Sequence, residues 1–597
     1  MSKLLLRCVV AGMLASVVPA VVTAQDDALS RALRDELARS IKELRLDQLE
    51  RPYYIAYRVQ EIQAIAVSAT MGSLLGGTDA RDRDLIPEVR VGDYAFDNTN
   101  FMGSSGGIGA LSVVGGPSMS FFGGLPLDDN YLELRRQIWL ATDAAYKEAA
   151  ETYAAKKAAL LTRARRDTLP DFTRITPTQT TDEIPSVTMS RADAEALVRE
   201  LSALPELARL SHSSVRMAVS NSRSRLITSE GTTSVLSRPM ITISASASTQ
   251  ATDGAPLQAS MHVFARSMQS VPPRDQLTQA VRTFAVRLDS LRSAPVLDRY
   301  SGPVIVEGRA AGELFAEVFA PALAGRRHPE GGPDFAAMME ANGRGVTTFT
   351  DKLGSRVLPT FLSVVDDPTI SERNGQPLFG NYRVDDDGVP GARKAIVDNG
   401  SLKLVLTTRN PVQGSSQSTG NHRGGGATPS NLIVTSTTSV TDAELKSRLL
   451  ALVKQRGLTY GIVIRELGGA SMNAEDPMSF FNAMRNRSAG RRVLLAYRMY
   501  PDGREELVRG VRLSDVTAQS FKDILAVSST QTVVHRPAVG SSDYPFPAEM
   551  LEMMADAGPS VALASYVVPA MLFEDLSLTS DTGDRPKPPL SSPPGAR

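Results

Sequence analysis

Cysteine is nearly absent from this chain of 597 residues, since only Cys8 occurs and it lies near the N-terminus. The residues after it therefore form no disulfide with one another and offer no thiolate to a metal. Common catalytic signatures are missing as well: the sequence has no HExxH, no CxxC and no phosphate loop ending in Gly-Lys-Ser/Thr. Gly103-Ser104-Ser105-Gly106-Gly107 matches the GxSxG nucleophile pattern, but it lies in a Gly/Ser-rich run where a chance match is easy, so it assigns no activity.

The chain also has no excess of charge of either sign. Its 65 Lys and Arg side chains are matched by 65 Asp and Glu side chains, which gives a formal net charge of zero. Because nucleic-acid binding draws on clustered positive charge, this balance predicts no nucleic-acid partner. After the first two dozen residues no apolar run approaches the roughly 20 residues that span a bilayer, so no membrane anchor is expected in the mature chain.

Residues 1–24 have the pattern of a secretory signal peptide. Lys3 and Arg7 precede an apolar stretch, and Val22-Thr23-Ala24 supplies the small residues of a cleavage site. A retained membrane anchor is the alternative, but the stretch is short for a bilayer span and Pro19 interrupts it. The pattern predicts cleavage and export, with a periplasmic or secreted mature protein.

Residues 25–300 predict an N-terminal α+β domain. Leucines recur at helical spacing over 28–50, and a longer helix is expected over 128–167. The glycine-rich stretch 103–124 between them is predicted to be a loop, serving as a lid or as a spacer. Alternating polar and apolar residues predict half-buried antiparallel strands at 53–59, 62–68, 87–96, 215–221, 224–228, 237–249 and 259–267.

Residues 301–580 are predicted to form a second, strand-rich antiparallel domain. A helix over 308–323 follows a short strand, and Asp398-Asn399-Gly400 predicts a hairpin because Asn-Gly accepts the positive φ angles of a tight turn. The proline-rich residues 581–597 are predicted to be a disordered tail. The run order is that of an α+β fold, without the βαβ rhythm of a parallel sheet.

The C-terminal half carries short motifs in a fixed order: Val365-Asp366-Asp367-Pro368-Thr369, Asp385-Asp386-Asp387-Gly388-Val389-Pro390, Asn399-Gly400-Ser401-Leu402, Ser418-Thr419-Gly420-Asn421-His422-Arg423 and Pro569-Ala570-Met571-Leu572-Phe573-Glu574-Asp575. Their order and spacing resemble those of the TldD/PmbA family, whose Thr-Gly-Asn-x-Arg loop matches the fourth motif. Arg90-Val91-Gly92-Asp93-Tyr94 resembles the family's N-terminal domain more loosely.

The resemblance implies zinc-dependent peptidases that act on short or unstructured peptides, often as two-subunit assemblies. One subunit of such an assembly carries HExxxH on the helix after the first strand of the C-terminal domain, and a later cysteine completes the site. Here Ala316, Glu317 and Pro321 occupy the first histidine, glutamate and second histidine places, and Ser528–Gln531 lie in the region of the cysteine. Alanine and proline offer a metal no ligand, so no cofactor is expected.

A replacement metal site would have to draw on side chains from elsewhere. The candidates are Glu317, His328, His422 and His535, none of which shows paired ligand spacing. Zinc is therefore expected only if folding assembles such a non-family site.

Two functions remain open. The first is an exported, zinc-less, non-catalytic subunit that binds peptide or a zinc-bearing relative, as a homodimer or heterodimer. Its predicted contact loop comprises Thr419, Gly420, Asn421, His422 and Arg423, because loops on a rigid scaffold commonly carry binding residues. The alternative is an active metallopeptidase that cleaves short or unstructured peptides through a non-family or shared metal site.

Overall fold

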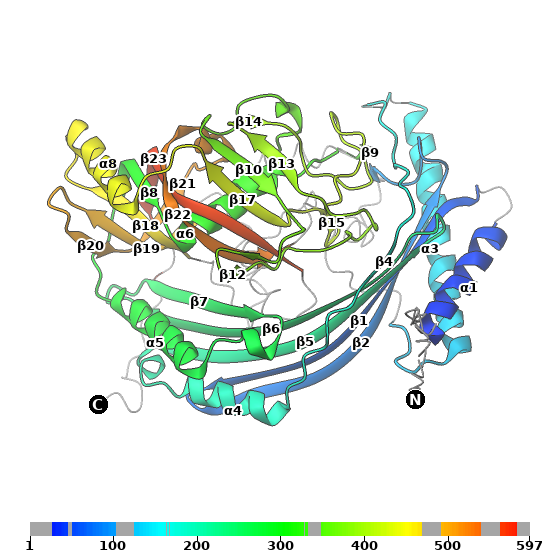
Figure 1. The fold of residues 1–597 in the computed structure, drawn as a ribbon, viewed down its shortest axis with the longest axis horizontal. Helices are drawn as coiled ribbons and strands as arrows, with labels where there is room; N and C mark the ends of the chain where they lie inside the picture. Colours follow the sequence, from blue (N-terminus) through cyan, green and yellow to red (C-terminus); the bar gives the residue numbers. More distant parts are fainter. Residues whose placement is uncertain are drawn as a thin grey trace, which may run out of the picture.

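The computed structural model describes residues 27–45, 50–102, 124–162, 164–165, 167–327, 329–331, 348–468, 491–538, 562–581 and 585. Two sheets dominate them, one of six strands from the N-terminal half and one of eleven strands from the C-terminal half. In Figure 1 the first sheet curves as a cradle below the second. This confirms the predicted α+β class. The predicted signal peptide, and almost all of the predicted glycine-rich loop and tail, lie outside the described residues.

Two pairs of short strands expected in the N-terminal sheet are each one long strand, β1 (Pro52–Thr70) and β5 (His212–Thr228). These two strands pair without interruption from Ala56–Thr228 to Ala69–Val215, so the polar residues between the expected segments do not break them. The sheet order is β2 (Ser73–Val91), β1, β5 and β6 (Thr233–Gln250), with β4 (Gln179–Asp182) and β7 (Pro256–Ala265) both paired to β6.

The two faces of this sheet differ in polarity. Alternate residues of β6, among them Ile241 and Ile243, pack with apolar side chains of α4 (Arg191–Ser202) and α5 (Arg274–Ser290). Figure 1 places both helices on the outer side of the curve and the C-terminal sheet on the inner side. The inner face of β6 therefore carries the intervening residues, which are mostly Ser, Thr and Arg.

Helices α1 (Ala28–Glu43) and α3 (Tyr131–Leu160) cover the far end of β1 and β2, and α3 is shorter than the helix predicted over 128–167. A charged helix end is usually exposed to solvent, but one of the basic residues near the end of α3 is buried. Lys156 is fully buried, and its Nζ lies 2.6 Å from a carboxylate oxygen of Asp171. A buried ammonium group needs a partner charge, and the carboxylate of Asp171 supplies it.

The C-terminal sheet is organised around its last long strand, β23 (Leu563–Ser580), which pairs with four others. They are β8 (Arg299–Val306), β17 (Asn431–Ser436), β21 (Val511–Ser514) and β22 (Ile524–Pro537). The remaining strands on the sheet's main path are β10 (Leu362–Asp366), β13 (Lys394–Asp398), β14 (Ser401–Leu402), β18 (Gly461–Leu467) and β19 (Arg491–Met499), and β20 (Glu505–Val508) pairs with β19. Helix α8 (Asp442–Gln455) packs against one side.

Short sequence signals mark the start of one helix and the turn of one hairpin. Ser190 caps α4 by accepting a hydrogen bond from the backbone of Asp193. Asn399 and Gly400 both have positive φ and close the hairpin between β13 and β14. Over the residues described, none of the helices has the length and apolar character needed to cross a membrane.

Candidate functional site

The helix after β8 carries the positions of the family metal motif. It begins as α6 (Arg309–Leu314), widens into a π-turn over Phe315–Phe319 and ends in a 3₁₀ turn over Ala320–Leu323. Gly312 allows α6 to lie directly on β22, since an added Cβ would stand 2.5 Å from the Cγ2 atom of Val534. The helix is thereby fixed against the strand that carries Arg536 and His535.

The π-turn bears on the spacing of Ala316 and Pro321. Five residues of regular α-helix turn the chain by about 500°, which would place these positions about 140° apart around the axis. A π-turn, with its backbone bonds running five residues along the chain, brings such positions closer to one face. Here the backbone N–H of Ala320 donates to the carbonyl of Phe315. The backbone thus has a shape that could align an HExxxH motif, although both histidine places hold other residues.

Glu317, at the family glutamate place, is held by two arginines. Its Oε1 accepts a 2.8 Å hydrogen bond from Arg536 on β22, and its Oε2 lies 3.3 Å from the Nε of Arg491 on β19. Its side chain is half-buried. Both carboxylate oxygens therefore face cationic partners, and neither is left turned toward an open metal position.

One turn earlier, Glu313 is buried within the same charged network. Arg309 donates to its Oε1, Arg536 lies 3.4 Å from the same oxygen, and the backbone N–H of Leu467 donates to its Oε2 at 3.1 Å. Glu466 lies beside this group and pairs with Arg287 at 2.9 Å. Burial raises the pKa of Glu466, while Arg309 opposes this rise.

Zinc does not fit these residues. Ala316 and Pro321 present no donor atom, and Glu317 is neutralised by guanidinium groups that a cation would have to displace. In the region of the family cysteine, the Ser528 hydroxyl donates to the carbonyl of Thr530. Within the part of the chain that the structure describes, no three His, Cys, Asp or Glu side chains are grouped as metal ligands.

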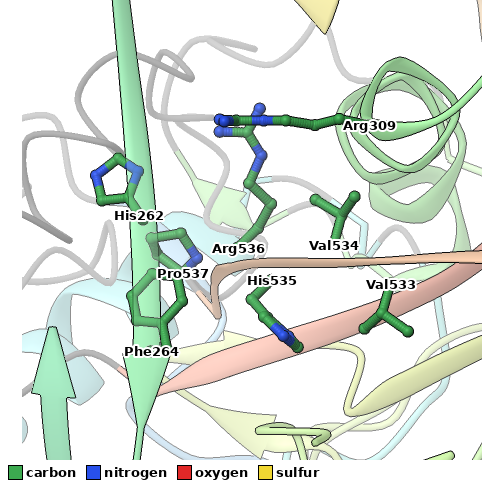
Figure 2. Close-up of a pocket in the computed structure, with 8 residues that line it drawn as sticks. All are labelled: His262, Phe264, Arg309, Val533, Val534, His535, Arg536 and Pro537. Atoms are coloured by element: carbon green, nitrogen blue, oxygen red, sulfur yellow. The ribbon is translucent and has the colours of Figure 1, made fainter. Parts of the chain in front are cut away.

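A pocket of about 200 Å³ opens between the two sheets beside this network. Figure 2 shows its lining residues: His262, Phe264, Arg309, Val533, Val534, His535, Arg536 and Pro537. His262 and Phe264 come from β7, Arg309 from α6, and the others from β22. The pocket thus lies where the inner face of the N-terminal sheet meets the strand that supports the metal-motif helix.

Successive side chains of β22 point to opposite faces of the strand. This alternation keeps two of the candidate metal ligands, His535 and Glu317, apart. Val534 and Arg536 point toward α6, whereas His535 points to the other side, as Figure 2 shows. There its Nδ1 lies 3.0 Å from the hydroxyl of Ser565, and its ring packs against Phe264 and Phe379. Burial, together with the charge of Arg266, lowers the pKa of His535 to about 4. His535 is therefore a neutral packing residue that does not converge with Glu317.

The Ser565–His535 contact is not the nucleophile–base pair of a serine hydrolase. Ser565 is fully buried, and its hydroxyl already accepts a 2.8 Å hydrogen bond from the backbone of Phe379. Substrate cannot reach an oxygen enclosed in this way. The contact ties β22 and β23 to the segment that contains Phe379.

His422 has a different environment. Its Nδ1 lies 2.9 Å from Asp387, which also pairs with Arg58 of β1 at 2.8 Å. Burial opposes protonation, but the Asp387 carboxylate outweighs it and raises the pKa of His422 to about 9. His422 is thus part of a charged link between β1 of the N-terminal sheet and the C-terminal domain. His328 lies outside the described residues.

The predicted contact loop is bonded internally. Thr419 donates to Asn421, Asn421 donates to Asp366 at 2.8 Å, and Ser430 donates to the other oxygen of Asp366. Asn421 is fully buried, and the Gly420 carbonyl accepts from a tyrosine hydroxyl. These motif residues hold several segments of the C-terminal domain together, and peptide binding by the loop stays a prediction.

Sequence reasoning missed His262, Phe264, Arg309 and Arg536. A usable signal existed for the first two. His262, Phe264 and Arg266 occupy every second position of the strand predicted over 259–267, so their side chains must lie on one face. Arg309 stands four residues before Glu313 on a predicted helix, which is the spacing of a helical ion pair. Arg536 gave no such signal, since its partners are more than 200 residues away in the chain.

Parts of the chain are similar in sequence to known proteins. Residues 299–580, just under half of the chain, match the model of the PmbA/TldA metallopeptidase C-terminal domain. A metalloprotease of Methanocaldococcus jannaschii is 40% identical over 81 residues, which are 13% of this chain and 17% of that protein. A metalloprotease of Archaeoglobus fulgidus is 32% identical over 83 residues, 14% of this chain and 18% of that one. The matches thus span less than a fifth of these relatives.

Two solved structures share the fold over nearly the whole chain. A modulator of a DNA gyrase from Thermotoga maritima gives a TM-score of 0.54 at 15% identity, covering 92% of this chain and 100% of that one. TldE from Thermococcus kodakarensis gives 0.54 at 12% identity, with 93% and 100% covered. At such identities the likeness establishes the fold alone.

The fold and the metal-motif helix together define a metallopeptidase-like protein. By its C-terminal domain and by the metalloproteases it matches, the chain belongs to the TldD/PmbA family.

Proposed function

We propose that this chain is an exported, non-catalytic member of the TldD/PmbA family that binds peptides without zinc. The observation that carries the proposal is the pairing of Glu317 with Arg536 and Arg491, beside Ala316 and Pro321 in the histidine places. A cation at this helix would meet guanidinium groups and no ligand, so the family reaction has neither its metal nor its activated water.

The pocket beside α6 supports the peptide-binding part of the proposal. It combines an apolar wall, formed by Phe264 and Val533, with the polar side chains of His262, Arg309 and Arg536. Such a mixture suits a short peptide, since apolar side chains and polar backbone groups both find partners. In the cell envelope the chain would act as a homodimer, or as a heterodimer with a zinc-bearing relative that supplies the chemistry.

Elemental analysis for zinc tests this function first. The chain from Gln25 onward, purified without a histidine tag and dialysed against trace zinc, is expected to hold far less than one zinc per chain. Near-stoichiometric zinc would overturn the zinc-less proposal. Alanine substitutions at Glu317, His328, His422 and His535 would then locate the ligands.

A matched pair of variants controls for adventitious zinc. Glu317→Gln removes the surviving motif carboxylate, and Glu574→Gln removes an exposed carboxylate on β23 that pairs only at the surface. Both variants are expected to give the same low zinc content as the unsubstituted chain. A selective loss of zinc in Glu317→Gln would identify a real metal site at the helix.

Partner formation is tested by co-expressing the chain with an exported relative that carries HExxxH. Joint elution at the mass of a mixed dimer, with peptidase activity in the mixture and none in this chain alone, is the expected result. Activity of this chain alone that is removed by a chelator would contradict a non-catalytic role.

A further inference from the structure

Beside the pocket, four arginines lie close to one another. They are Arg238, Arg266, Arg383 and Arg423, here called the arginine cluster, and Asp182 at the end of β4 lies among them. Arg238 lies 2.9 Å from Asp182 and the exposed Arg383 lies 3.5 Å from it. Among the described residues, neither Arg266 nor Arg423 forms an ion pair with a carboxylate.

Strand register places two of these arginines on the inner face of the N-terminal sheet. Phe264 of β7 pairs with Thr242 of β6, so these two residues lie on the same face of the sheet. Arg266 follows Phe264 by two residues and Arg238 precedes Thr242 by four, so both arginines lie on that face as well. Residues that share a face on neighbouring strands are close enough for long side chains to meet. Arg238 and Arg266 therefore turn the same way, toward the C-terminal domain.

The C-terminal domain supplies Arg423 at the same place. The Nη2 atom of Arg266 donates to the carbonyl of Phe379 at 3.0 Å, and the Nη1 atom of Arg423 donates to the next carbonyl, that of Gly380, at 3.5 Å. Adjacent carbonyls of one segment thus hold both guanidinium groups close together. Arg266 also lies over the Phe379 ring, 5.4 Å from its centroid.

The charge in the arginine cluster is not balanced. Arg423 is only 8% exposed, and the Nε of Arg266 is buried without a hydrogen-bond acceptor in the described part of the chain. Burial and the charges of Arg238 and Arg423 lower the pKa of Arg266 to about 10. A buried cation that lacks an opposite charge is costly, and a planar guanidinium with free donors matches an oxyanion.

We propose that the arginine cluster is an oxyanion site that takes the terminal carboxylate of a peptide held in the adjacent pocket. Phe264 lines that pocket, and Arg266 follows it on the same face of the sheet, so one peptide could contact both. The carboxylate would lie between Arg266 and Arg423, and the preceding side chain would rest on Phe264. This assignment rests on the proposed peptide-binding function and adds the end of the peptide that is recognised.

Calorimetric titration of the chain from Gln25 onward with two probes tests the site. The probes are acetyl-tetraalanine with a free carboxylate and the same peptide with a terminal amide. The free acid is expected to bind the unsubstituted chain roughly tenfold to a hundredfold more tightly, because hydrogen bonds to a charged group are strong. Arg266→Gln is expected to bind acid and amide alike.

Arg274→Gln is the matched control. Arg274 is an exposed arginine on α5 that pairs with Glu200 at 2.6 Å, on the outer side of the sheet. This variant is expected to keep the full preference for the free acid. Arg266→Lys keeps the charge but loses the planar fork, and it should retain only part of the preference. Thermal unfolding of each variant verifies that it is folded.

Inorganic phosphate distinguishes the two sources of an oxyanion. One outcome is that phosphate binds the unsubstituted chain but not Arg266→Gln, while the peptides show no preference for the free acid. This result would support an oxyanion site but would overturn a peptide carboxylate as its ligand. An acid preference that persists in Arg266→Gln, or the lack of any Arg266-dependent binding, would overturn the site itself. Zinc content is independent of these results, so the zinc-less proposal can fail while the site stands, or the reverse.

Discussion

Two groups of charged side chains lie near the junction between the sheets, and they are balanced in different ways. Around α6, the carboxylates of Glu313, of Glu317 in the π-turn and of Glu466 on β18 are each paired with arginine. In the arginine cluster, only two of the four guanidinium groups, those of Arg238 and Arg383, pair with a carboxylate of the described residues, that of Asp182. The carboxylates of the first group are all paired within the protein. In the second group, guanidinium donors such as the Nε of Arg266 have no acceptor among the described residues and could bind an anion.

This difference is the basis for placing the proposed binding site at the arginine cluster and not at the metal-motif helix. At the metal-motif helix, arginines occupy the electrostatic position that a cation would take, so the carboxylates stabilise the domain without a metal. At the arginine cluster the like charges oppose one another, and a bound oxyanion would relieve that repulsion. We therefore expect substitutions at α6 to change stability and substitutions in the arginine cluster to change binding.

The largest expected effect is at Glu313. Glu313→Gln should lower the free energy of unfolding by about 3–5 kcal/mol, because it removes the buried carboxylate that Arg309 and Arg536 share. Urea unfolding followed by circular dichroism measures this. Glu317→Gln is the control and should cost about 1–2 kcal/mol, since its side chain is 19% exposed. Equal losses at the two positions would contradict a closed network centred on Glu313.

The two described histidines among the candidate ligands should show opposite pH dependence. The folded pKa of His535, about 4, is below the unfolded value near 6.5, so its contribution is present above pH 6.5 and lost as the pH falls toward 4. The loss is on the order of 3 kcal/mol. The folded pKa of His422, about 9, is above the unfolded value, so its contribution is present below pH 6.5 and lost as the pH rises toward 9.

Unfolding measured across pH in two variants separates these contributions. His535→Phe should flatten the stability profile between pH 4 and 6.5, and His422→Gln should flatten it between pH 6.5 and 9. Each variant serves as the control for the other. A profile that keeps its slope in both variants would show that other groups set the pH dependence.

A smaller effect is expected where α6 lies on β22. Gly312→Ala should lower the free energy of unfolding by about 1–3 kcal/mol, because the new methyl group overlaps Val534 and pushes the helix away from the strand. Gly76→Ala is the matched control, since no atom lies within 4 Å of a Cβ added there. A change of the same size at both glycines would contradict close packing as the cause.

The smallest effect, and the one of opposite sign, is expected at Arg266. Arg266→Met should raise the free energy of unfolding in anion-free buffer by about 1 kcal/mol, because it removes a half-buried cation from among like charges. Arg274→Met, on the outer surface, should leave stability unchanged to within about 0.5 kcal/mol. A loss of stability in Arg266→Met would mean that Arg266 stabilises the folded chain. The charges of the arginine cluster would then be balanced within the protein, as the charges around α6 are.

Much of the fold could be predicted from local patterns. Helical leucine spacing located α1, and Asn399-Gly400 located a hairpin. Strand lengths were underestimated, because polar residues within β1 and β5 read as breaks although their neighbours pair through them. Periodicity reports which residues share a face, and it does not report how far a strand is paired.

The candidate site was predicted only in part. The sequence by itself determined that the two histidine places of the family motif hold no zinc ligand, since the side chains of Ala316 and Pro321 have no donor atom. It also determined the family resemblance, through motifs such as Asp366 and Asn421 whose side chains meet in a buried hydrogen bond. These features depend on residue identity and order, which the sequence states directly.

Only the tertiary structure decided the electrostatics. Glu317 meets Arg536 because α6 packs on β22, and Arg266 meets Arg423 because the inner face of the N-terminal sheet faces the C-terminal domain. These pairs are separated by more than 150 residues, and Coulomb interactions act over distances in space that spacing in the chain does not encode. The sequence states which charges are present, and the packing of the two sheets decides which of them are neutralised.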